Sequence, residues 1–110
     1  MTDMELQAYF RTIYMMFMKL ENVMDKGTRI EWPVQSSTQD VRSCAIRTGN
    51  QVVVLVVNLS NETSSNVSFG TKAKTAADFF DDVWKYPIKD NKINLKLKPN
   101  GTAILRLVFQ

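Results

Sequence analysis

Few side chains in this sequence could perform acid–base or metal chemistry, and the most suggestive group is three aspartates around one turn. Asp78, Asp81 and Asp82 could supply the paired carboxylates that hydrolysis of a glycosidic bond requires, or could ligate calcium. However, the sequence predicts no apolar pocket to tune one of them as an acid, and a spaced calcium loop with a central glycine is missing. We therefore expect a solvated turn here.

The absence of other residue types excludes most catalytic machinery. The chain has no histidine and one cysteine, which removes Ser-His-Asp and Cys-His catalysis, histidine–metal centres and zinc clusters. We predict no catalytic, metal-binding or cofactor-binding residues and no enzyme activity of the chain alone. Cys44 falls in an expected strand and is interpreted as a small core or edge residue.

Three aromatic residues form the main binding hypothesis. Trp32, Trp84 and Tyr86 could make a platform on which sugar rings stack through their C–H faces. Aromatic residues near turns more often close the ends of a β-sandwich core, and we favour that role. Carbohydrate is an expected partner only if the three aromatic residues form the sugar platform.

The charge pattern argues against nucleic acid. Lys plus Arg is 14 and Asp plus Glu is 11, a net charge of +3. Six basic residues in the C-terminal third face only Asp90, namely Lys85, Lys89, Lys92, Lys96, Lys98 and Arg106. They could bind phosphates, but lysines on a solvated strand edge, where they oppose aggregation, are the favoured interpretation. No apolar run approaches the roughly 18 residues of a membrane span.

Four Asn-X-Ser/Thr sequons begin at Asn58, Asn61, Asn66 and Asn100. They accept glycans only in a secretory context. Each falls in a predicted turn, where Asn, Ser and Thr are favoured for backbone reasons, so we interpret them as turn residues. Acidic Asp3 replaces the basic residues of a signal peptide, which leaves the localisation open.

The first 27 residues predict one long amphipathic helix over residues 3–26, which packs on the rest of the chain or on a partner. Its apolar stripe, at alternating steps of four and three, is the candidate interface: Leu6, Phe10, Ile13, Phe17, Leu20 and Met24. Gly27 is expected to stop the helix by taking the left-handed conformation.

Residues 28–110 predict a β domain. Expected strands lie at 29–34, 41–47, 52–57, 67–69 and 75–80, with a polar loop at 35–39, an Asn/Ser/Thr loop at 58–66 and a closing hairpin from Ile93 to Phe109. The residues at 75–80 could instead make a helical turn. In its turn, Pro99 presets φ and Gly101 is expected to supply a positive φ. The fold class is mainly β: an antiparallel β-sandwich of about seven or eight strands, of Greek-key type, with one long N-terminal helix.

The expected strand at 52–57 is apolar on both faces. Val52, Val54 and Val56 alternate with another apolar set of Val53, Leu55 and Val57. The opposite sheet can cover only one set, so the helix or a missing partner is expected to cover the other.

Asn50 to Phe109 resembles the C-terminal β-sandwich of multidomain glycoside hydrolases of the α-amylase-like, α-galactosidase-like and β-galactosidase-like kinds. The matching segments are VVVLVVNLSNET, AADFFDDVW and INLKLKPNGTAILRL. The preceding LQAYFRTIYMMFMKLENVMDKGT is similar to the last helix of the catalytic (β/α)8 barrel that leads into this sandwich.

The resemblance implies a non-catalytic accessory domain with a structural or domain-interface role. No part of the chain matches the family's catalytic carboxylates, so none is carried over. The implied partner is the catalytic barrel of a parent glycosidase, with self-association through the helix as the other outcome. A secreted parent would place the domain outside the cytoplasm. Carbohydrate-binding and protein-interaction modules are the alternatives.

Overall fold

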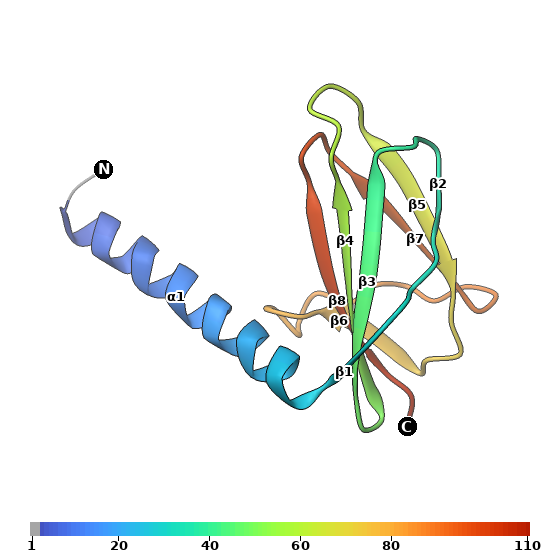
Figure 1. Ribbon diagram of the computed structural model, residues 1–110, viewed down its shortest axis with the longest axis horizontal. Helices are drawn as coiled ribbons and strands as arrows, with labels where there is room; N and C mark the ends of the chain where they lie inside the picture. The colour runs from blue at the N-terminus through green and yellow to red at the C-terminus, as the bar shows by residue number, and fades with distance from the viewer. Residues whose placement is uncertain (1–2) are drawn as a thin grey trace.

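The structure is a computed structural model that describes residues 3–110, with all side chains except those of residues 3, 5–6, 8–14 and 16–17. Helix α1 (Asp3–Lys26) covers the predicted range and is followed by strands (Figure 1). These are β1 (Thr28–Ile30), β2 (Gln35–Ser36), β3 (Val41–Thr48), β4 (Gln51–Asn58), β5 (Ser65–Gly70), β6 (Thr75–Asp78), β7 (Lys92–Leu97) and β8 (Thr102–Val108). The predicted mainly β class and strand number are confirmed.

Two antiparallel sheets face each other as a sandwich (Figure 1). The five-stranded sheet has the order β1-β3-β4-β8-β6, and the three-stranded sheet has the order β2-β5-β7. The chain crosses between the sheets repeatedly, so β4 and β8 are neighbours although three strands separate them in sequence. Their register places Val54 opposite Leu105.

The core follows the two-residue period of the strands. In β7, Ile93, Leu95 and Leu97 are buried while the intervening residues are exposed, as the alternation predicts. The inward-facing residues of β4 and β8 are buried too, but most of their intervening residues are half-buried, and Val53 is buried. The buried cluster includes Ala45, Val52, Val54, Val56, Val67, Phe69, Ala103, Leu105 and Leu107.

Several strand boundaries differ from the predicted ones. β1 ends at Ile30 rather than residue 34, since Pro33 lacks the N–H that a continuing ladder needs. β2 forms inside the expected polar loop by pairing with β5, which itself begins at Ser65, within the expected 58–66 loop. β2 and the start of β5 are extended because each hydrogen-bonds to a neighbouring strand. The apolar periodicity of a sequence does not predict such pairing.

Two hairpin turns use residues with positive φ. In the β3–β4 turn, Thr48 pairs with Gln51 and Gly49 has φ 61°, which suits the first central position of a type II′ turn. In the β7–β8 turn the expectation for Gly101 was wrong, because Asn100 carries the positive φ of 57°. A Cβ at Gly101 would lie 2.8 Å from the Lys98 carbonyl oxygen, so glycine is needed there for space.

The end of α1 also differs from its expected mechanism. Gly27 does not take the left-handed conformation, although its N–H bonds the Val23 carbonyl at 2.9 Å. A Cβ at this position would collide with Ile46 and would lie 2.7 Å from the Thr48 hydroxyl. Gly27 is therefore required because the helix end rests directly on β3.

Candidate functional site

The outer face of the five-stranded sheet carries a small second core. Ile46, Val53 and Ala77 are at most 6% exposed, and Phe79 is fully buried, yet none belongs to the cluster between the sheets. The register pairs Val53 with Ile46, which places both on the face opposite Val52 and Val54. We call these four residues the outer cluster.

Helix α1 is anchored at this cluster by its last two turns. The Lys19 ammonium donates a hydrogen bond to the Phe79 carbonyl at 2.6 Å and lies 4.8 Å from the centre of the Phe79 ring. The Arg106 guanidinium approaches the same ring at 5.1 Å. Leu20 and Val23 are half-buried. Phe79 thus joins the helix to the sheet through both its ring and its backbone.

Beyond this anchor, the outer face is only partly covered. Cys44, Leu55, Val57 and Ile104 are half-buried and share the face of Val53, since Leu55 pairs with both Cys44 and Ile104. Figure 1 shows that the C-terminal end of α1 lies at the sheet, whereas the N-terminal half of the helix points away from it. We call these four residues the outer apolar surface.

The helix carries further exposed apolar side chains. Met15 is 66% and Met18 51% exposed. Of the predicted interface, Leu20 is half-buried and Met24 is 57% exposed. The remaining four members lie outside the described side chains: Leu6, Phe10, Ile13 and Phe17. On the second face of β4, Val53 is buried beside Ile46, on which the helix end rests, whereas Leu55 and Val57 are only half-buried.

The three aromatic residues of the predicted sugar platform lie in two places. Trp84 is 64% exposed and, with half-buried Tyr86, lines a shallow hollow against β7. Burial raises the pKa of the Tyr86 phenol, and the Asp78 carboxylate adds to the shift. Trp32 lies elsewhere and packs edge-on against Phe69, with ring centres 5.7 Å apart.

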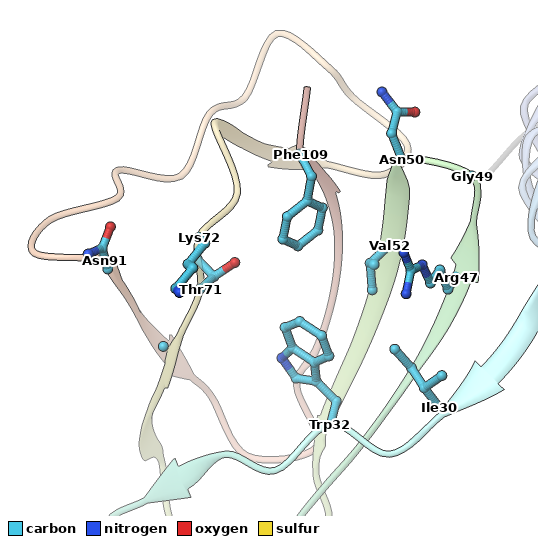
Figure 2. A pocket seen from close by; sticks show the side chains of 11 residues that line it. Ile30, Trp32, Arg47, Gly49, Asn50, Val52, Thr71, Lys72, Asn91 and Phe109 are labelled. Atoms are coloured by element: carbon cyan, nitrogen blue, oxygen red, sulfur yellow. The ribbon is translucent and has the colours of Figure 1, made fainter.

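Trp32 lines a cavity of about 640 Å³ at the end of the sandwich that carries the β3–β4 turn. In Figure 2 the rings of Trp32 and Phe109 lie across the cavity from one another, with Ile30 and Val52 beside them. The remaining lining is polar or glycine: Arg47, Gly49, Asn50, Gly70, Thr71, Lys72 and Asn91. We call this the end cavity; its residues come from five separate parts of the chain.

The three aspartates have structural partners within or beside one turn. The Asp78 carboxylate accepts hydrogen bonds from the backbone N–H groups of Phe80 and Asp81 at 2.8 and 3.0 Å. Asp81 accepts one from the Val83 N–H, and Asp82 forms an ion pair with Arg106 at 3.3 Å. Among the described residues, no group of three or more His, Cys, Asp or Glu is placed to hold a metal ion.

Of the sequon asparagines, Asn58 has the most pronounced structural role. It is fully buried, and its amide donates to the carbonyl oxygens of Thr63, Lys98 and Leu97 at 2.8, 3.2 and 3.4 Å. Its side-chain oxygen accepts from the Ser60 N–H at 3.1 Å. This Asx turn ties the loop after β4 to the β7–β8 turn. Asn61, Asn66 and Asn100 are exposed.

The basic residues of the C-terminal third lie on more than one surface, and Lys85 and Lys96 both line the hollow beside Trp84. Lys92 and Lys96 project from β7, an edge strand of the three-stranded sheet, where exposed lysines oppose strand addition. Arg106 instead lies on the outer face beside Phe79. In the described part of the chain, the helix is not apolar enough over its length to cross a membrane.

Phe79 and the end cavity escaped the sequence analysis, whereas Asn58 was expected to be a turn residue. Phe79 was placed in an ordinary strand, and no local pattern distinguishes it from Phe80. The role of Asn58 was detectable in part, because an Asn directly after an apolar strand and two residues before a Ser favours an Asx turn. The end cavity has no local sequence pattern.

No model of a known protein family matches the sequence, and no curated protein matches it. Among solved structures, a noncanonic maltogenic α-amylase from Thermotoga neapolitana matches with a TM-score of 0.51 and 22% identity over 81% of this chain. A GH27 β-L-arabinopyranosidase from Geobacillus stearothermophilus matches with a TM-score of 0.56 and 15% identity over 76% of it. The chain spans 22% and 20% of those two proteins. The predicted resemblance is thus confirmed for the fold: the chain has the architecture of a segment making up about one fifth of two glycoside hydrolases.

Proposed function

We propose that this chain is a non-catalytic accessory domain that packs against the catalytic barrel of a glycoside hydrolase. The observation that carries the proposal is the outer apolar surface, which spans neighbouring strands β3, β4 and β8. Apolar side chains contiguous across three strands favour an interface over a solvated face, and the exposed methionines of α1 add apolar surface on the helix. The fold similarity to segments of two glycoside hydrolases supports this choice of partner.

The geometry favours a wedge-shaped contact. The helix is fixed at its C-terminal end by Lys19 and Gly27 and then diverges from the sheet (Figure 1). A partner entering this angle would touch both the helix and the outer apolar surface. Completing the burial of Leu55, Val57 and Ile104 would contribute roughly 1 kcal/mol for each side chain. Methionines at the edge suit such a contact, because they adapt to irregular shapes.

Recovery of the natural gene product from its own cells tests the proposal. An antibody against residues 28–110 is used, and the captured material is identified by intact mass and peptide sequencing. We expect a glycosidase catalytic domain, either on the same polypeptide or bound to it. Recovery of a free 110-residue chain without such a domain would overturn the proposal.

Matched variants then locate the contact. Leu55→Lys introduces a charge into the outer apolar surface and should release a bound barrel, or lower the melting temperature of a covalently joined one. Leu59→Lys is the control, since Leu59 is 56% exposed but lies in the loop after β4. Equal effects of the two substitutions would exclude this surface as the interface. With the isolated chain, sedimentation shows whether the same surface drives self-association.

A second candidate function, carbohydrate binding, is favoured by the exposure of Trp84 next to Tyr86. The two residues line one hollow with Pro87 between β7 and the segment after β6. Polysaccharides are titrated against the wild type and Trp84→Ala. Binding that is absent, or unchanged in the variant, would eliminate this candidate.

A further inference from the structure

The end cavity combines an apolar interior with a cationic mouth. Ile30, Trp32 and Phe109 are partly buried and pack against the core, while Val52 belongs to it. These four side chains form the interior, and the two rings provide flat surfaces on opposite sides (Figure 2). A volume of about 640 Å³ is within the range of small-molecule sites.

The mouth carries two positive charges. Arg47 is the penultimate residue of β3 in one sheet, and Lys72 follows β5 of the other sheet, so the cations lie on different sides of the opening in Figure 2. None of the lining residues is acidic. Among the residues that the structure describes, the single ion pair joins Arg106 to Asp82, so neither mouth cation has a carboxylate partner there.

We propose that the end cavity binds a small organic acid whose body is flat and apolar, such as an aryl-substituted carboxylate. The body lies between Trp32 and Phe109, where burial of apolar surface and offset ring contacts stabilise it. The carboxylate remains at the mouth between Arg47 and Lys72. This site is separate from the outer apolar surface, with which it shares no residue.

The charge arrangement selects this ligand class over two others. A neutral apolar molecule would fill the interior but gain no attraction from the two exposed cations at the mouth. A highly polar ligand, such as a free sugar, would displace water from the apolar interior without replacing its hydrogen bonds. An acid with one apolar end satisfies both parts of the cavity.

The test is a titration followed by two-dimensional amide NMR of the whole chain. The probe is 3-phenylpropionate, and 3-phenylpropan-1-ol is its neutral match. We expect shifts at residues 30, 47–52 and 70–72 with the acid, and weaker binding of the alcohol. Arg47→Gln and Lys72→Gln should each weaken acid binding about two- to fivefold, as solvent-exposed ion pairs do.

The control is Lys96→Gln, which removes an exposed lysine that does not line the cavity and should leave binding unchanged. Because Arg47 and Lys72 are exposed, their replacement is not expected to impair folding. Three results would overturn the proposal: no shifts at millimolar acid, equal binding of acid and alcohol, or equal weakening by the control substitution.

Discussion

Replacement of Asn58 tests how the loop after β4 is held. In Asn58→Ala the two amide N–H groups and the side-chain oxygen are lost, and with them hydrogen bonds to Thr63, to the Lys98 region and from Ser60. Three neutral bonds at about 1 kcal/mol each give a loss of roughly 3 kcal/mol. For a chain of this length the melting temperature should fall by roughly 10 °C.

Asn58→Asp sharpens the test through its pH dependence. The variant keeps an acceptor for the Ser60 N–H but places a carboxylate in a fully buried position facing three carbonyl oxygens. These surroundings would raise the pKa of the introduced carboxyl in the folded state. Its stability should therefore be greatest at low pH and decline as the pH rises through that raised pKa.

Urea unfolding followed by tryptophan fluorescence measures both variants. Asn94→Ala is the control, because Asn94 is exposed on β7, and it should change stability by no more than about 0.5 kcal/mol. A loss below about 1 kcal/mol in Asn58→Ala would refute the reasoning. So would an Asn58→Asp variant that is more stable at neutral than at acidic pH.

Three further perturbations test the helix anchor and the buried phenol. Phe79→Ala should cost about 3–5 kcal/mol in urea unfolding, because the ring is fully buried between the helix and the outer face; a smaller cost than for Phe80→Ala would contradict this. Gly27→Ala should lower the melting temperature and shift the amide NMR signal of Ile46, since the added methyl group meets that side chain; an unchanged spectrum would argue against the close approach. The raised pKa of Tyr86 means that its contribution to stability persists below pH 10 and is lost above it, where the unfolded phenol ionises first. We therefore expect the free energy of unfolding of the wild type and of Tyr86→Phe to depend on pH in the same way below pH 10. Above pH 10 the wild type should lose stability relative to Tyr86→Phe.

Sequence periodicity predicted those parts of the fold that depend on local alternation. The buried side of β7, the helix range and the β3–β4 turn at Gly49 all follow from residues close together in sequence. The doubly apolar strand β4 also correctly indicated a second covered face at Val53.

The rest depends on contacts between distant segments. Gly27 and Gly101 were identified as necessary glycines, but for a wrong reason, because steric limits set by Ile46 and Lys98 are not visible locally. The end cavity joins residues 30 and 109, whose proximity only the strand order establishes. Phe79 is buried among groups that are distant in sequence, since Lys19 of the helix and Arg106 of β8 both lie over its ring.

The position of β8 has a consequence for how the sandwich assembles. The eighth strand in the chain lies inside the five-stranded sheet, between β4 and β6, so its pairings span about 50 residues to β4. Such non-local closure slows folding, because loop entropy is lost before the new contacts compensate for it. During synthesis, the edge of the apolar strand β4 that pairs with β8 stays unpaired until residues 102–108 have left the ribosome. Chaperone dependence and early aggregation should therefore be governed by β8, although the long helix precedes all the strands in sequence.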